Sequence, residues 1–265
     1  MKFPGVRADN DMYTYGFSFN PWQGPIIGKG QDIKRYINDT AEKFNIKNHI
    51  LFDTQVTSSS WKDNQWTTKT NRKNFTSQYV IFSTGSRDRK NPHLPKFKNE
   101  NKYQGKIVHT QAWGNTDYKN KNVTIIGSGC TAITMTPSIV KEAKTVTLIQ
   151  RTPGYIINID SQEKSTRSYK TFETLKDYFH SRLFKKSFKK KILSSDPYYD
   201  DITTPKYDFW DQRPASSVDN DYFISVKSNK VSLETEEISN WETIGVKLKN
   251  GKVIDSDITV MATGG

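Results

Sequence analysis

A glycine-rich turn is the stretch whose residue types and spacing point most directly to chemistry. It follows the β-branched run 122–126 and consists of Gly127, Ser128, Gly129, Cys130, Thr131 and Ala132, a GxGxxA pattern. In such a turn the first glycine permits a tight bend, the second lets the backbone approach a pyrophosphate, and the small third residue allows close helix–strand packing. A helix over about 130–144 would direct its free N–H groups at the phosphates. The pattern predicts a dinucleotide site.

The end of the next strand-like run, 145–150, indicates which dinucleotide the turn would bind. A site for NAD usually has Asp or Glu at this point, whereas this chain continues with Arg151 and Thr152. A guanidinium can hold a 2′-phosphate through two hydrogen bonds, and the threonine hydroxyl adds a further donor. The alternative is an exposed arginine that merely ends a strand. We predict NADP.

The single cysteine, Cys130, excludes an internal disulfide framework and favours a reducing cytoplasm. Its place at a helix N-terminus would lower the pKa of its thiol. Because no neighbouring residue completes a nucleophile–base pair, we nevertheless predict a packing role. The four histidines are scattered, so the sequence predicts no metal site.

Three blocks of sequence must position these residues. The first is 1–91, the second is a linker over 92–121, and the third is the dinucleotide-binding block 122–265 with a helical insert at about 161–213. Because strands and helices alternate, the chain predicts an α/β fold with a mainly parallel sheet.

Within these blocks the local patterns predict individual elements. A helix is expected near 32–43, and short strands follow it and end at 79–82. After the insert, strand-like sequence resumes at Tyr222 and continues to 258–264. No apolar run is long enough to span a bilayer.

The insert carries a basic amphipathic pattern. Its apolar residues fall at roughly helical spacings and lie among five lysines: Phe179, Leu183, Phe184, Phe188 and Ile192, with Lys185, Lys186, Lys189, Lys190 and Lys191. Such a helix can lie on an anionic membrane surface. We expect instead that the stripe packs on the dinucleotide-binding block and leaves the lysines in water.

The formal net charge of +12 raises the question of a polyanionic partner. The basic residues are spread along the whole chain, and none of the usual nucleic-acid-binding signatures occurs. We therefore expect no nucleic acid partner. A positive field would equally attract an anionic dinucleotide.

The segment 103–113 resembles the fingerprint of flavin-containing and Baeyer–Villiger monooxygenases, FxGxxxHxxxW. The matching residues are Tyr103, Gly105, His109 and Trp113. Tyrosine replaces the usual phenylalanine at the first position, and Gly114 stands where a proline often follows the tryptophan. As in that family, the fingerprint precedes the GxGxxA turn.

Other segments resemble parts of the same family in the same order. Residues 3–9 are similar to the end of the second family signature, and 83–85 and 262–264 resemble the two crossings between domains. Residues 209–213 resemble a stretch before the last strands of the NADPH domain. The resemblance implies a Rossmann-like flavoprotein with two dinucleotide-binding domains, of which the FAD domain is incomplete.

The resemblance also implies a reaction and a catalytic pair. NADPH would reduce FAD, and a C4a-peroxyflavin formed with molecular oxygen would oxygenate a ketone, an amine or a sulfide. Arg213 matches the arginine that stabilises the negative charge, and Asp9 matches its acidic partner, with an ordinary solvated ion pair as the alternative. Gln212 stands where Baeyer–Villiger members often have lysine, which leaves that branch open. His109 and Trp113 are expected to position the linker.

A full member would open with a strand and a GxGxxG turn for FAD, whereas this chain starts inside the following signature and stops at 264–265. We therefore expect a fragment that binds NADP weakly and FAD poorly unless the missing segments complement it. The alternatives are a non-catalytic NADP-binding remnant and a non-oxygenating flavin-dependent reductase. The lack of a CxxC pair argues against a disulfide reductase.

Overall fold

The computed structural model describes residues 3–85, 95–161, 205–207 and 211–264. Its contacts define two compact units, one made of residues 1–33 together with 89–265, and the other of residues 34–88. The apolar stripe and the lysines of the predicted insert lie outside the described residues.

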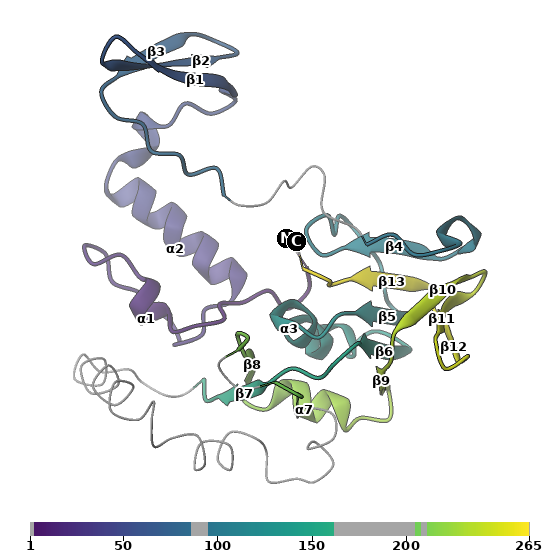
Figure 1. Cartoon of the computed structure of the whole chain (residues 1–265). Coiled ribbons are helices and arrows are strands. Elements are labelled where there is room, and N and C mark those ends of the chain that lie inside the picture. Colours follow the sequence, from purple (N-terminus) through teal and green to yellow (C-terminus); the bar gives the residue numbers. More distant parts are fainter. Residues whose placement is uncertain (1–2, 86–94, 162–204, 208–210, 265) are drawn as a thin grey trace. The chain divides into compact units, whose positions relative to one another are not determined.

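The larger unit is built on a five-stranded sheet in which every neighbouring pair of strands is parallel (Figure 1). In spatial order the strands are β4 (Lys106–His109), β13 (Ile258–Met261), β5 (Asn122–Ile126), β6 (Thr145–Gln150) and β9 (Val231–Thr235). The predicted α/β fold with a mainly parallel sheet is confirmed. The strands on either side of the glycine turn have the predicted bounds.

Both faces of this sheet are buried, and successive residues of a strand serve opposite faces. Ile125 packs in a cluster with helices α3 (Cys130–Ile139) and α7 (Asp221–Val226). Ile126 packs in a second cluster with Trp241 and Val246. Those two residues belong to an antiparallel meander of β10 (Ile238–Glu242), β11 (Gly245–Leu248) and β12 (Val253–Asp255). A central strand covered on both sides must be apolar throughout, as the β-branched run is.

The remaining described elements of this unit are short. A parallel pair, β7 (Ile156–Ile159) and β8 (Ala215–Val218), follows β6 in the chain. The N-terminal segment contributes the single-turn helix α1 (Met12–Tyr15), and a 3-10 turn, η2 (Glu100–Lys102), precedes β4.

The helix after the glycine turn ends earlier than predicted, at Ile139 rather than near residue 144. Pro137 lies inside its last turn and has no N–H to offer the carbonyl of Ile133. One turn is reinforced by a side chain, since Thr136 Oγ1 donates to the Ala132 carbonyl at 2.8 Å.

The prediction of a strand from Tyr222 onward is wrong, because this run is the helix α7 and strand β9 starts only at Val231. Asp221 initiates the helix. Its carboxylate accepts from the backbone N–H groups of Val218 at 3.1 Å and Tyr222 at 2.8 Å. A short apolar run fits either structure, and an acidic residue in the first turn favours the helix.

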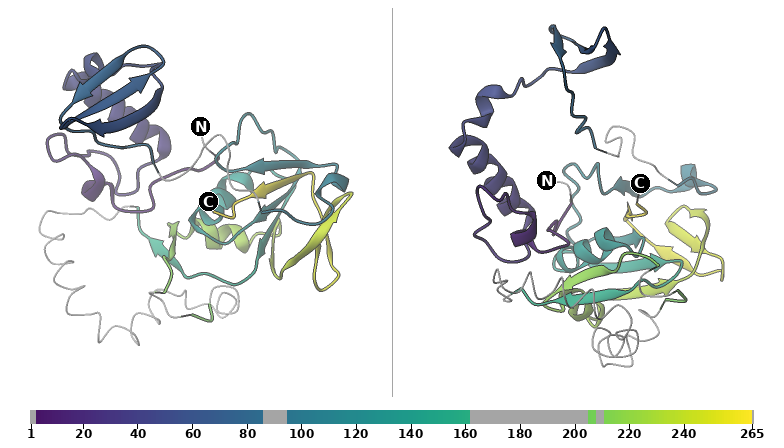
Figure 2. Two further views of the ribbon diagram at one scale, coloured as in Figure 1. Left: turned by 45° about the horizontal axis from the view of Figure 1, so that its top comes forward. Right: turned by 60° about the vertical axis from the view of Figure 1, so that its left-hand side comes forward.

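The smaller unit has simpler architecture. The predicted helix near 32–43 is α2 (Gly30–Lys43), which lies in this unit from residue 34 onward, and a 3-10 turn, η1 (Ile46–His49), follows it. A three-stranded antiparallel meander follows, with β1 (Val56–Lys62), β2 (Gln65–Thr70) and β3 (Asn74–Ser77) (Figure 2).

The strand predicted at 79–82 does not form. The segment is irregular, and the side chains of Tyr79 and Ile81 are 84% and 89% exposed. Composition alone cannot make a strand, because its N–H and C=O groups need a neighbouring strand, and none of the described strands pairs with it.

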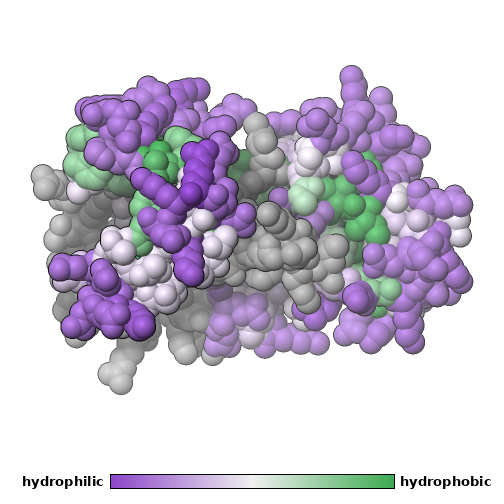
Figure 3. All heavy atoms as spheres, turned by 90° about the horizontal axis from the view of Figure 1, so that it is seen from above, coloured by the Kyte–Doolittle hydropathy of each residue, from purple (hydrophilic) through white to green (hydrophobic). Residues whose placement is uncertain are grey.

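Hydrophilic side chains predominate on the face shown in Figure 3, in keeping with the net charge of +12. Sequence motifs predict three domains, 1–91, 92–121 and 122–265. The two compact units are defined differently, by contacts between residues. Residues 1–33 share a unit with the dinucleotide-binding block. The domain division itself stays a prediction.

Replacing Ile125 by alanine should destabilise the larger unit by about 2–5 kcal/mol, because the fully buried side chain leaves a cavity between the sheet and α3. The free energy of unfolding in denaturant measures this cost. The control is Ile224→Ala on α7, where the side chain is 65% exposed. Its effect should stay within about 0.5 kcal/mol, and equal losses in the two variants would contradict the burial of Ile125.

Candidate functional site

The first glycine of the turn stands where no other residue fits. Gly127 follows β5 with φ +132°, and a Cβ there would come within 2.3 Å of the carbonyl oxygen of Ala262, just after β13. The Gly127 N–H donates to the Ile149 carbonyl at 2.9 Å. The turn is therefore fixed to both neighbouring strands at the carboxyl end of the sheet, where ligands bind in open α/β folds.

The second glycine leaves its surroundings open. Gly129 is the N-cap of α3, and a Cβ there would meet no atom within 4 Å. No side chain caps the helix at this end, so its first amides remain available to an anion. Ala132 is fully buried against the sheet, which explains the small third residue of the pattern. These features are consistent with the predicted dinucleotide turn, whose binding role stays a prediction.

The residues predicted to select NADP lie beside this turn. Arg151 and Thr152 follow β6 and are exposed. The hydroxyl of Ser128 donates to the Thr152 carbonyl at 3.3 Å, which holds the strand end next to the glycines. The preceding residue, Gln150, is buried, and its Nε2 donates to Thr235 Oγ1 at 3.0 Å. The backbone at Arg151 is therefore held in place, while its side chain is exposed.

Asp9 and Arg213, which are far apart in sequence, form an ion pair. Asp9 Oδ2 lies 3.6 Å from Arg213 Nη2, and the two side chains are 35% and 61% exposed. An ion pair this exposed adds little to stability. It lies next to the turn, because Cys130 Sγ is 3.9 Å from the carbonyl oxygen of Pro214. The fold brings the predicted catalytic pair to the start of α3.

The pKa of the Cys130 thiol depends on burial and on the charges around it. Burial raises the pKa of its thiol, the Asp9 carboxylate raises this pKa further, and the Arg213 guanidinium opposes both. The net result is a raised pKa of the thiol, contrary to the lowering expected at a helix N-terminus. A thiol with a raised pKa is a poor nucleophile at neutral pH, which supports the packing role.

The first two fingerprint residues depend on each other. Tyr103 is buried, and its hydroxyl donates to the Ser256 carbonyl at 2.9 Å and accepts from Thr259 Oγ1 at 3.1 Å. Burial raises the pKa of this phenol. A Cβ at Gly105 would lie 2.2 Å from the tyrosine oxygen. Glycine is needed here because the ring folds over it.

The other two fingerprint residues are also buried. His109 ends β4 opposite Met261, and its Nδ1 accepts from the Gln111 N–H at 3.2 Å. The indole of Trp113 meets the ring of Tyr118 edge-on at 6.1 Å. The His109 contact orders the start of the loop after β4, and Trp113 packs in the same cluster as Ile125. Both contacts support the expected positioning role.

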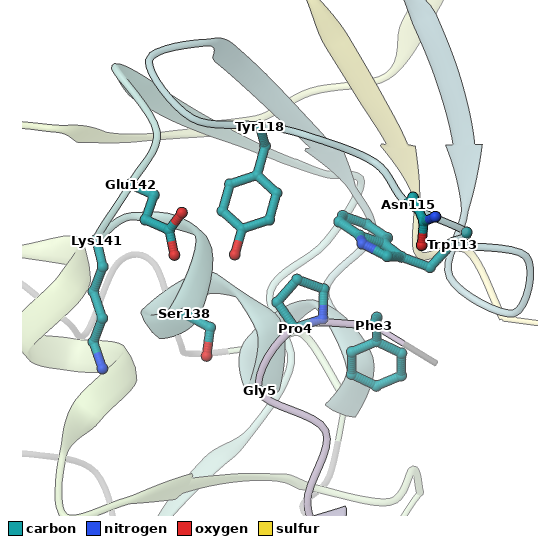
Figure 4. Close-up of a pocket in the computed structure, with 10 residues that line it drawn as sticks. Phe3, Pro4, Gly5, Trp113, Asn115, Tyr118, Ser138, Lys141 and Glu142 are labelled. Carbon is teal, nitrogen blue, oxygen red and sulfur yellow. The ribbon is translucent and has the colours of Figure 1, made fainter. Parts of the chain in front are cut away.

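A surface pocket of about 520 Å³ lies at the other end of α3, away from the glycine turn (Figure 4). In it, Tyr118 points toward Ser138 and Glu142. The lining comes from the N-terminal segment, the loop after β4, the end of α3 and the residues that follow it: Phe3, Pro4, Gly5, Trp113, Gly114, Asn115, Tyr118, Ser138, Lys141 and Glu142. No sequence pattern indicated this pocket.

An ion pair that the sequence did not indicate, between Arg7 and Asp221, joins the N-terminal segment to α7. The two residues are 214 positions apart, and neither stands in a motif that points to the other. The only local signal was the position of Arg7 two residues before Asp9.

Two negative findings apply to the described part of the chain. There, no group of three or more His, Cys, Asp or Glu side chains is placed to hold a metal ion. None of the helices described is long and apolar enough to cross a membrane.

The parallel sheet, the glycine turn at its carboxyl edge and the neighbouring arginine define a dinucleotide-binding oxidoreductase fold. A family model for pyridine nucleotide-disulphide oxidoreductases matches residues 26–206. The chain belongs to this family. Because it has a single cysteine, it lacks the redox-active pair that the family name suggests.

The relatives identify the branch of this family more narrowly. The chain is 32% identical over 295 residues to the probable FAD-binding monooxygenase AlmA of an Acinetobacter species, covering 99% of this chain and 59% of the relative. It is 30% identical over 296 residues to the FAD-containing monooxygenase EthA of Mycobacterium tuberculosis, covering 99% and 60%. The chain thus spans about 60% of the length of these relatives. The predicted resemblance to flavin-dependent monooxygenases is confirmed.

Solved structures agree on the fold. An oxidized steroid monooxygenase bound to NADP superposes with a TM-score of 0.76 at 21% identity, covering 99% of this chain and 63% of that one. A cyclohexanone-bound cyclohexanone monooxygenase gives a TM-score of 0.76 at 19% identity, with coverage of 99% and 64%.

Alanine at the two turn glycines should separate folding from binding. Gly127→Ala should cost at least about 2 kcal/mol in unfolding free energy, because a side chain would collide with the Ala262 carbonyl at a strained φ. Gly129→Ala has room and should cost about 1 kcal/mol or less, yet weaken dinucleotide binding measured by calorimetry. Equal stability losses in the two variants would contradict the geometry.

Proposed function

We propose that this chain forms the NADP-binding part of an FAD-dependent monooxygenase that uses NADPH and molecular oxygen to oxygenate a ketone, an amine or a sulfide. The observation that carries the proposal is the Asp9–Arg213 pair beside the glycine turn. An ordinary dinucleotide-binding domain needs the turn alone. A carboxylate and a guanidinium from distant segments, brought to the same place, indicate a second task.

The preference for NADP rests on the strand end after β6. It presents a cation and a hydroxyl, and no carboxylate stands at the position that would accept from a ribose 2′-hydroxyl. Arg151 and Thr152 would hold the 2′-phosphate, and the amides at the start of α3 would hold the pyrophosphate. The steroid monooxygenase of similar fold has NADP as its bound dinucleotide.

FAD would be the second cofactor, as the names of AlmA and EthA indicate for those relatives. When bound, FAD accepts electrons from NADPH and reacts with oxygen, which side chains cannot do. The role of this chain is then electrostatic. Arg213 would place a positive charge where negative charge develops, and Asp9 would fix the direction of the guanidinium.

A disulfide reductase is disfavoured by composition. Such an enzyme passes electrons through a pair of cysteines, whereas this chain has only Cys130. Its thiol has a raised pKa and lies against Pro214 rather than a second sulfur.

Replacing Arg151 by glutamine should weaken NADP⁺ binding about 10- to 100-fold and leave NAD⁺ binding unchanged, because only NADP⁺ carries the 2′-phosphate that the guanidinium would hold. Calorimetric titration of both dinucleotides measures the difference. Arg72→Gln, which removes an exposed arginine of the smaller unit, should bind both as the parent does. A parallel loss of NAD⁺ binding in Arg151→Gln would refute the assignment.

Asp9→Asn and Arg213→Gln should both suppress substrate-dependent oxygen uptake in chain incubated with FAD, because each removes one half of the charge pair. Their affinities for NADP⁺ should stay within about threefold, a change of roughly 0.6 kcal/mol. An oxygen electrode and an NADPH absorbance assay, run with a ketone, an amine and a sulfide, test this. NADPH oxidation by the parent chain without oxygen uptake would show a reductase and overturn the proposed function.

A further inference from the structure

A second ion pair joins the same two parts of the chain as the Asp9–Arg213 pair, and it is far better buried. Arg7 Nη1 lies 2.5 Å from Asp221 Oδ2, and Arg7 Nη2 lies 3.3 Å from Asp221 Oδ1. The two side chains are only 12% and 28% exposed. Two parallel contacts between a guanidinium and a carboxylate fix orientation as well as distance.

Asp221 is itself held rigidly. Besides Arg7, its carboxylate accepts from the Ser217 hydroxyl at 3.1 Å and from the backbone N–H groups of Val218 at 3.1 Å and Tyr222 at 2.8 Å. These donors belong to β8 and to the first turn of α7. Arg7 is therefore docked to a site that the local backbone determines.

The segment that carries Arg7 is fixed at several further points. Gly5 has φ +76°, and a Cβ there would come within 2.9 Å of the Thr134 carbonyl of α3. The N–H of Ala8 donates to the Gly28 carbonyl at 2.8 Å. The Ser216 hydroxyl donates to the carbonyl of Asp9 at 3.3 Å, and Arg7 Nη2 also donates to the Ser216 carbonyl at 3.3 Å.

The two ion pairs are therefore parallel cross-links between residues 7–9 and residues 213–221. Arg7 precedes Asp9 by two residues, and Arg213 precedes β8 by two. The Asp9–Arg213 contact, at 3.6 Å and largely in solvent, is too weak to align its own segments. The mostly buried, bidentate contact between Arg7 and Asp221 can align them. We propose that Arg7 and Asp221 are positioning residues that hold the Asp9 carboxylate against Arg213.

This inference rests on the proposed function for its meaning, but its test needs no cofactor. Cys130 is the only cysteine, so the pH dependence of its reaction with a small disulfide reagent yields one thiol pKa. Asp9 raises the pKa of this thiol and Arg213 lowers it. The thiol therefore senses whether the carboxylate stays in place.

The informative variant is Arg7→Gln. If Arg7 only contributed charge, its removal would raise the pKa of the Cys130 thiol, because a nearby cation favours the thiolate. If it positions Asp9, the freed carboxylate moves away and the pKa of the thiol falls. We expect the fall, and we expect Asp9→Asn to lower the pKa of the thiol in the same direction. In an Asp9→Asn background, Arg7→Gln should produce no further fall.

The control is Lys252→Gln, which breaks the exposed ion pair between Lys252 and Glu234 at 2.6 Å and should leave the pKa of the thiol unchanged. An unchanged or raised pKa of the thiol in folded Arg7→Gln would overturn the proposal. If that variant does not fold, Arg7→Lys is the substitute, because lysine keeps the positive charge but cannot make the two parallel contacts to Asp221. A thiol pKa equal to that of the parent in folded Arg7→Lys would also overturn the proposal.

Activity provides an independent comparison. In chain incubated with FAD, Arg7→Gln should lower kcat for oxygen uptake to the level of Asp9→Asn while leaving NADP⁺ affinity unchanged. A lowered thiol pKa in a chain that oxidises NADPH without oxygen uptake would support the positioning pair and refute the proposed function. Full kcat in Arg7→Gln would refute the positioning role even where oxygenation itself is observed.

Discussion

The close approach of Gly127 to the Ala262 carbonyl is the constraint on which the site depends. A Cβ at residue 127 would lie 2.3 Å from that oxygen, so the chain leaves β5 in a direction that only glycine permits. That direction sets where α3 begins, where its first amides point, and how Cys130 comes to rest near Pro214. The neighbouring strand, β13, enters the sheet from a distant part of the sequence. The turn therefore reaches its final geometry only once β13 has joined the sheet.

The parts of the fold that were predictable are those whose signal is local. The strands 122–126 and 145–150 and the turn between them were found because β-branched runs and spaced glycines depend on neighbouring residues alone. Where the deciding factor lay elsewhere, the predictions failed. The run beginning at Tyr222 is a helix whose first residue is the acidic Asp221, and the run 79–82 has no neighbouring strand among those described.

The candidate site divides in the same way. The glycines and Arg151 follow from pattern and position, whereas Asp9 and Arg213 were identified only through a family resemblance and remain predictions in their catalytic role. The pairing of Arg7 with Asp221 had no signal, because nothing in the sequence links residues 214 positions apart. Local rules also misjudge Cys130: a helix start lowers the pKa of a thiol, yet burial and the Asp9 carboxylate raise the pKa of this one.

The tyrosine at the first fingerprint position has a consequence for divergence within the family. Its buried hydroxyl has two partners, the carbonyl of Ser256 and the hydroxyl of Thr259. A phenylalanine there would leave the Thr259 hydroxyl with only the Ser256 hydroxyl, 3.2 Å away, as a partner, and an apolar residue at 259 would remove one partner of the tyrosine. Positions 103 and 259 are thus coupled through this hydrogen bond. In an alignment of relatives, tyrosine at the first position should coincide with a hydroxyl-bearing residue at the second.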